Sequence, residues 1–207
     1  MLTATCAAQE KTIAYSILLD NTGSMRSQFD HAREIAKAVV HQIHDHGPVS
    51  VFDFHTQGIG PGSRAEAILR IEATQDESTL GRGIDSLYVE GGQTSLLDAV
   101  KAVGESLHKS DEEHKVIILI TDGEDRVSDI NQRTLDKFLK DNQLNVFAVG
   151  MVEPLDSNQK TIRGGSKTKA VELLNSMAKE TGGRAVFPIA KKMDISALLT
   201  ELAIPTQ

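Results

Sequence analysis

Near its N-terminus the chain reads Ile17-Leu18-Leu19-Asp20-Asn21-Thr22-Gly23-Ser24-Met25. An apolar run leads directly into the carboxylate of Asp20. After Asn21 come a hydroxyl residue, a glycine and a second hydroxyl residue. The spacing D-x-T-x-S brings Asp20, Thr22 and Ser24 to one side of a tight turn. We therefore expect a buried β-strand whose C-terminal end carries three oxygen-bearing side chains, with a helix beginning just after it.

Short β-branched runs with the length of strands recur along the chain. They cover residues 12–19, 49–55, 116–121, 144–152 and 184–188, and the partly alternating residues 67–73 fit an edge strand. The runs around Ile17 and Ile118 are almost wholly apolar, which is typical of central strands covered on both faces.

Segments with apolar residues at helical spacing lie between these runs. They cover residues 27–44, 76–87, 95–107, 129–140, 167–181 and 194–202, the last with Asp194 as its N-cap. Strands that alternate with helices predict an α/β fold: a doubly wound, Rossmann-like and mostly parallel six-stranded sheet with helices on both faces. We expect one domain over residues 12–203, with tails at residues 1–11 and 204–207.

The composition supports one packed domain. The chain has 207 residues, of which 40 % are hydrophobic and 25 % charged, so disorder is not expected. Aromatic residues make up only 4 %, which fits the aliphatic core of a parallel sheet.

The net charge of −7 argues against nucleic acids and anionic membranes as partners. No run approaches the length of a membrane span.

The cellular location stays open. Cys6 is the single cysteine, so no intrachain disulfide forms, and we expect an unpaired thiol in the N-terminal tail. Residues 1–11 lack the basic and apolar regions of a signal peptide. We expect a soluble domain, cytoplasmic if the chain is complete and extracytoplasmic if an export signal has been removed.

A second carboxylate and a third hydroxyl group, each on a further loop, indicate a metal site. The run at residues 116–121 ends in Asp122-Gly123, and Gly91-Gly92-Gln93-Thr94-Ser95 precedes a helix. If the two strands are neighbours, Asp20 and Asp122 meet at one edge of the sheet and repel each other unless a cation lies between them. Hydroxyl and carboxylate oxygens suit Mg²⁺, Mn²⁺ or Ca²⁺, whereas Zn²⁺ is disfavoured because these loops contain no Cys or His.

These motifs resemble the metal-ion-dependent adhesion site of von Willebrand factor type A domains, especially the bacterial ones, and the resemblance covers residues 12–203. It implies hydroxyl ligands from Thr22, Ser24 and Thr94, and carboxylates at Asp20 and Asp122 that bind directly or through water. The chain departs from the common D-x-S-x-S pattern at Thr22, and Gln93 stands where many relatives pass directly from glycine to threonine.

The resemblance implies a protein-binding module in which the cation holds a Glu or Asp of a partner. An enzyme would need a general base or nucleophile, and these loops offer no His, Cys or Lys in such a role. We interpret Glu124 and Asp125 as solvated surface groups. Two alternatives remain: a Mg²⁺-dependent phosphoryl hydrolase, based on the paired Asp residues, and a scaffold subunit of an ATPase or secretion assembly with a structural metal.

Other candidate residues have simpler interpretations. His41, His44 and His46 fit a solvated helix end, where cations interact well with the helix dipole. His55 follows a strand near the expected metal edge and is interpreted as a satisfied rim histidine. Met25 is interpreted as a packing residue.

Overall fold

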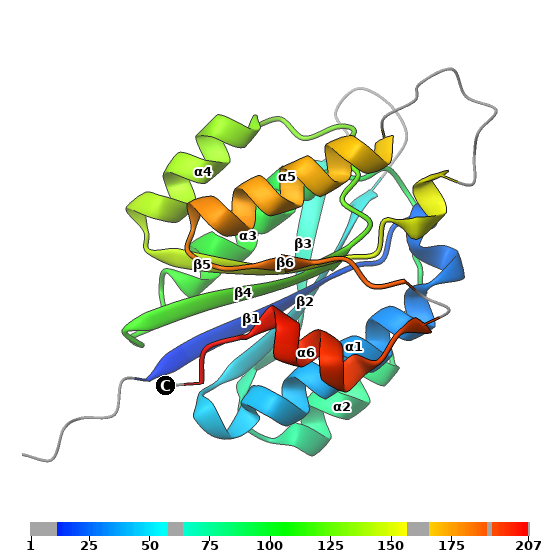
Figure 1. Cartoon of the computed structure of the whole chain (residues 1–207). Helices are drawn as coiled ribbons and strands as arrows, with labels where there is room; N and C mark the ends of the chain where they lie inside the picture. The colour runs from blue at the N-terminus through cyan, green and yellow to red at the C-terminus, as the bar shows by residue number, and fades with distance from the viewer. Residues whose placement is uncertain (1–11, 58–63, 157–165, 190–191, 207) are drawn as a thin grey trace, which may run out of the picture.

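Within residues 12–57, 64–156, 166–189 and 192–206, which the computed structural model describes, six strands form one sheet. Their order across the sheet is β3-β2-β1-β4-β5-β6 (Figure 1). The strands are β1 (Ile13–Asp20), β2 (Val49–Gln57), β3 (Arg64–Thr74), β4 (His114–Thr121), β5 (Leu144–Gly150) and β6 (Ala185–Val186).

The sheet is mostly parallel, as predicted. β1 pairs with β2 and β4, β4 with β5, and β5 with β6, all in parallel. β3 is antiparallel to β2, and it is longer than the edge strand predicted at residues 67–73. The connection from Gln57 to Arg64 is shorter than the dozen residues that a parallel crossover needs, so the two strands run in opposite directions.

Helices cover both faces of the sheet, which confirms the doubly wound architecture (Figure 1). One face packs against α1 (Phe29–Ile43), α2 (Glu77–Asp85) and α6 (Ile195–Leu202). The other face packs against α3 (Leu96–Leu107), α4 (Gln132–Asp141) and α5 (Ser166–Glu180). The described residues also form three 3₁₀ segments: η1 (Gly23–Ser27), η2 (His44–His46) and η3 (Glu153–Asp156).

The helix predicted from residue 27 begins later than expected. A 3₁₀ turn, η1, comes first, and α1 begins only at Phe29. Gln28 separates the two, and its buried side-chain Nε2 donates to the carbonyl of Met151 at 2.7 Å. This contact links the start of α1 to the segment after β5. Because it spans more than a hundred residues, periodicity gave no sign of it.

The helix predicted at 129–140 also starts later, at Gln132. The backbone N–H groups of Asp129 and Ile130 donate to the carboxylate of Asp98, at 2.8 and 3.2 Å, so these two residues are held outside the helix. Asn131 is the N-cap, and its side-chain oxygen accepts from the N–H of Thr134. At the other end of the chain, Asp194 caps α6 as predicted.

The core consists of two aliphatic layers, one on each face of the sheet. Ile17 and Leu18 of β1 are both fully buried, and they belong to opposite layers. Ile117 and Ile118 of β4 repeat this arrangement, as the apolar runs predicted. Among the residues that the structure describes, no helix combines the length and apolarity that crossing a membrane requires.

The two ends of the described chain lie at one end of the sheet, opposite the carboxyl ends of β1 and β4 (Figure 1). The hydroxyl of Tyr15 in β1 donates to the carbonyl of Pro205 at 2.8 Å, and Ile204 is buried in the core. Burial raises the pKa of Tyr15 to about 12. Cys6 lies outside the described residues.

Candidate metal centre

The candidate site lies where β1 and β4 end side by side. These strands are neighbours in the sheet, and the chain order reverses between them, so their connections leave toward opposite faces. Open α/β sheets bind ligands in the crevice at such a point. Asp20 is the last residue of β1, and Asp122 directly follows β4.

Asp20 is fully buried and accepts three hydrogen bonds. Its Oδ1 accepts from the backbone N–H of Thr22 at 3.0 Å and from the hydroxyl of Thr22 at 2.6 Å. Its Oδ2 accepts from the hydroxyl of Thr121 at 2.6 Å. These bonds fix the carboxylate at the strand end.

The three expected hydroxyl groups meet around Thr22. The Oγ1 of Thr22 lies 3.2 Å from the Oγ of Ser24, and the hydroxyl of Thr94 donates to the same Oγ1 at 3.5 Å. Thr22 and Thr94 are buried, and Ser24, which lies in η1, is half-buried. The structure thus brings together side chains that are up to 72 residues apart in sequence.

Asp122 is also buried, and the turn after it requires glycine. Its Oδ1 accepts from the backbone N–H of Glu124 at 3.0 Å. Gly123 has φ of +78°, which side chains rarely adopt, and a Cβ there would lie 2.9 Å from the Cβ of Ala170 in α5. Glycine therefore lets α5 pack closely over the turn that positions Asp122.

The electrostatics of this pair fit a cation. Burial, and then the charge of Asp122, raise the pKa of Asp20 from 3.8 to about 7, although its hydrogen bonds oppose the shift. Among the ion pairs between described residues, no Lys or Arg pairs with either carboxylate. A divalent cation would supply the positive charge, and the all-oxygen donor set matches Mg²⁺, Mn²⁺ or Ca²⁺.

Backbone hydrogen bonds connect the three loops. The carbonyl of Asn21 accepts from the N–H groups of Glu90 and Gly91, at 3.0 and 3.3 Å. The carbonyl of Thr94 accepts from the N–H of Arg126 at 2.9 Å. Each loop is therefore held by another, which fixes the relative positions of the candidate ligands.

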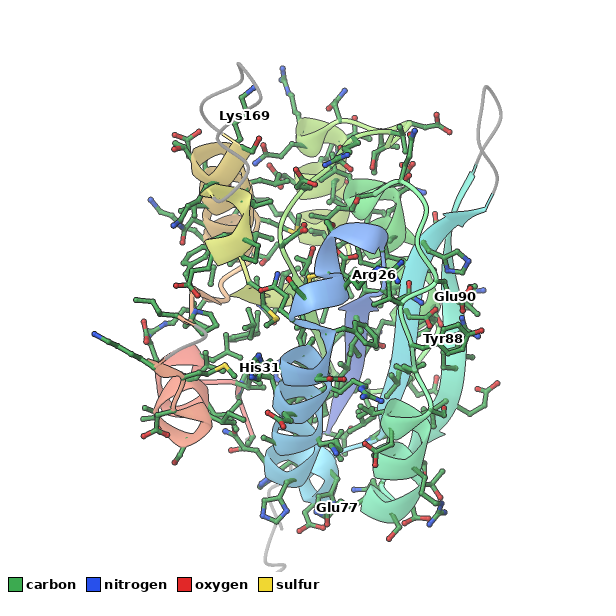
Figure 2. All side chains as sticks on the ribbon, turned by 90° about the vertical axis from the view of Figure 1, so that its right-hand side faces the viewer. Arg26, His31, Glu77, Tyr88, Glu90 and Lys169 are labelled. Carbon is green, nitrogen blue, oxygen red and sulfur yellow. The ribbon has the colours of Figure 1, made fainter. Side chains whose placement is uncertain are left out.

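Sequence reasoning missed a polar network behind the site. Buried Asp53 of β2 accepts from Asn21 Nδ2 at 3.0 Å and from Arg70 Nε at 2.8 Å. Burial raises the pKa of Asp53, and its bond to Arg70 opposes the shift. Arg70 also pairs with Glu90, which lies beside Tyr88 in Figure 2. Nothing in the local sequence pairs β3 with these residues, so only the fold reveals the network.

Three further interpretations can be compared with the structure. His55 is buried, and its Nε2 lies 3.0 Å from Oε2 of Glu90, but its buried Nδ1 has no hydrogen-bond partner among the described residues, so the predicted satisfied histidine is confirmed only in part. Met25 is fully buried, as expected of a packing residue. Glu124 is not a free surface group, because it forms an ion pair with Arg126 at 2.5 Å.

Asp125 is exposed, but it also accepts hydrogen bonds. Its Oδ1 accepts from the hydroxyl of Ser128 at 2.5 Å and from the backbone N–H of Leu97 at 3.4 Å. Within the part of the chain that the structure describes, Thr121 is the side-chain hydrogen-bond partner of Asp20 that the sequence interpretation did not assign to the site. Its position just before Asp122, at the end of a buried strand, was the available signal.

Solved structures share this fold. An aerotolerance-related membrane protein from Bacteroides fragilis aligns with a TM-score of 0.67 and 17 % identity, covering 92 % of this chain and 98 % of that one. BatB from Bacteroides thetaiotaomicron gives 0.66 and 18 %, covering 92 % and 97 %. The pilus adhesin SpaC from Lactobacillus rhamnosus GG gives 0.67 and 15 %, covering 92 % and 29 %.

Sequence comparison identifies the family. A search of curated protein sequences found no match. The family model of the von Willebrand factor type A domain matches residues 16–201, a range that includes the C-terminal part of β1, all of β4 and all three loops of the candidate site. The chain therefore belongs to the von Willebrand factor type A domain family.

Proposed function

We propose that this domain binds a partner protein through a divalent cation held by Asp20, Thr22, Ser24, Thr94 and Asp122. The observation that carries the proposal is the meeting of three hydroxyl groups around Thr22, which donates to Asp20, a carboxylate whose pKa is raised by burial and then by the charge of Asp122. Membership of the family supports it, because von Willebrand factor type A domains are protein-interaction modules. One structural neighbour, SpaC, is a pilus adhesin.

The bound cation would supply positive charge at the end of the sheet. Hydroxyl ligands leave that charge in place, and two carboxylates neutralise it fully only if both coordinate closely. A carboxylate from a partner then completes the ligand set. The residues of this chain hold the cation and orient the site, and a Glu or Asp of the partner provides the remaining oxygen.

The surroundings favour binding over catalysis. The two acidic residues that follow Asp122 in the chain already make contacts of their own, since Glu124 pairs with Arg126 and Asp125 accepts from Ser128. These contacts hold the two side chains in place, and a general base would have to be positioned on the attacking water instead. We therefore infer a module that is not an enzyme. A Mg²⁺-dependent hydrolase remains an alternative, which a phosphatase screen with metal titration separates from binding.

Affinity capture tests the proposal. The full chain is immobilised, exposed to an extract of the native cells in Mg²⁺, and eluted with EDTA. We expect a specific protein in the eluate of the wild type and none from Asp122→Asn, which retains an oxygen for the N–H of Glu124. Partners that stay bound in EDTA would contradict the proposal and favour the scaffold alternative with a structural metal.

A matched pair of variants isolates the hydroxyl ligand. Thr22→Ser keeps the oxygen that donates to Asp20, whereas Thr22→Val keeps the shape and removes the oxygen. We expect Thr22→Ser to bind Mg²⁺ like the wild type, and Thr22→Val to bind at least tenfold more weakly in isothermal titration calorimetry. Equal Mg²⁺ affinity in both variants would exclude Thr22 as a ligand.

A further inference from the structure

A second group of metal-binding side chains meets at the far end of α1. His41 Nδ1 lies 2.9 Å from Oε1 of Glu77, and His44 Nε2 lies 3.5 Å from Oε2 of the same carboxylate. One donor atom from each of the three residues lies within 4.8 Å of the others. His41 is exposed, but the side chain of His44 is only 17 % exposed, so the predicted solvated helix end does not describe all of this group.

Two packed helices bring these residues together. His41 lies in the last turn of α1, and His44 follows the end of that helix, so the spacing of three residues places both on one side. Glu77 is the first residue of α2, whose N-terminus is fixed by Asp76, a cap that accepts from the N–H of Ser78. The ligands therefore come from defined helix ends.

A neighbouring carboxylate orients one of the histidines. Asp45 Oδ1 lies 3.2 Å from Nδ1 of His44. When the ring proton is on Nδ1, next to this carboxylate, Nε2, the atom that faces Glu77, has a free lone pair. Histidines that bind metals usually donate their other ring N–H to a carboxylate or carbonyl in this way.

We propose that His41, His44 and Glu77 form a second metal site, which takes Zn²⁺. Two imidazole nitrogens and a carboxylate are ligands that Zn²⁺ favours, whereas Mg²⁺ prefers oxygen alone. Three protein ligands leave a fourth tetrahedral position for water or for a group from another molecule. In the absence of metal, the same residues form partly exposed ion pairs, which contribute little stability.

The second site is separate from the candidate site at the strand ends. The fifteen residues of α1 lie between them and span about 22 Å. In Figure 2, Glu77 lies at the bottom of the view, well below Arg26 of η1. The ligand types also differ, so each site should respond to its own cation.

Calorimetric titration of the full chain with ZnCl₂ in excess Mg²⁺ tests the proposal. The wild type should bind one equivalent of Zn²⁺. Glu77→Gln, which changes a half-exposed side chain and should not disturb folding, should weaken Zn²⁺ binding at least tenfold, as should His44→Gln. Asp45→Asn, which affects only the orienting contact, should weaken it by about tenfold.

Two controls make the result specific. His108→Gln removes an exposed histidine elsewhere, and Asp20→Asn alters only the other site; both should bind Zn²⁺ like the wild type. The proposal is overturned if the wild type binds no Zn²⁺, or if Glu77→Gln and His44→Gln bind it as tightly as the wild type. A tenfold loss in His108→Gln would also overturn it, because the ion would then lie elsewhere.

Discussion

Replacing Asp20 by asparagine should make the metal-free domain more stable and also insensitive to Mg²⁺. Asparagine has nearly the same shape, and its side-chain oxygen still accepts from the N–H and hydroxyl of Thr22. The hydroxyl of Thr121, which now donates to Asp20, can rotate to accept from the new amide. The fold should therefore tolerate the change, and the main effect is the loss of a buried charge.

The size of the effect follows from the raised pKa of Asp20. The pKa is about 7 in the folded protein and 3.8 when unperturbed. The contribution of Asp20 to stability is fully present below the unperturbed pKa and is lost as the pH rises through the folded-state pKa. The reason is that the folded state keeps the proton to a higher pH than the unfolded state does. One pKa unit corresponds to about 1.4 kcal/mol, so ionisation of Asp20 at about pH 8 lowers the free energy of unfolding by at most roughly 4 kcal/mol.

We expect the variant to recover about half of this, roughly 2 kcal/mol, because its amide makes weaker hydrogen bonds than a carboxylate does. For a domain of this size, that raises the Tm by about 4–8 °C. Mg²⁺ should stabilise the wild type and not the variant, which is the opposite of the effect of the substitution itself. At about 100 times its Kd it should add about 2.7 kcal/mol to the wild type and nothing to the variant.

Thermal unfolding in EDTA and in Mg²⁺, measured between about pH 5 and pH 8, checks both effects. Asp30→Asn, a change at an exposed position of α1, serves as the control and should follow the wild type. The reasoning is refuted if Asp20→Asn is less stable than the wild type at about pH 8 in EDTA. It is refuted equally if Mg²⁺ stabilises the variant as much as the wild type.

Other predictions concern packing and the polar network. Gly81→Ala should stabilise the protein by about 0.5–1 kcal/mol, because a Cβ there meets nothing within 4 Å and alanine favours a helix. Gly83→Ala in the same helix should destabilise the protein by about 1–3 kcal/mol, because the new Cβ would lie 2.1 Å from Cδ1 of Ile71. Urea unfolding of the two variants should show changes in the free energy of unfolding with opposite signs, and changes of the same sign would contradict this reasoning. Arg70→Met should cost about 2–3 kcal/mol by removing the cation beside buried Asp53, which would keep only its hydrogen bond from Asn21, and the cost should be clearly less in an Asp53→Asn background. A cost that is the same in both backgrounds would show that the pair is not coupled.

The sequence predicted the features that depend on local pattern. The apolar runs around Ile17 and Ile118 indicated central strands, and their alternation with helices indicated a doubly wound sheet; both are confirmed. The motifs placed Asp20 and Asp122 at the C-terminal ends of two strands, and the expected meeting of the two carboxylates required those strands to be neighbours, which they are.

The features that sequence reasoning missed depend on contacts between distant segments. Gln28 delays the start of α1 through a bond to Met151, 123 residues away. Glu77 joins His41 and His44 only because α1 and α2 pack together. Periodicity describes the faces of single elements, and it does not indicate which residues of two elements come into contact.

The position of the chain ends sets how this domain would carry a mechanical load. Both described ends lie at one end of the sheet, where Tyr15 is bonded to Pro205, and the candidate site lies at the other. A partner pulling on that site would place tension along β1. Because β1 is hydrogen-bonded on both sides by parallel strands, that tension would pass along the backbone of a strand that is held at both edges.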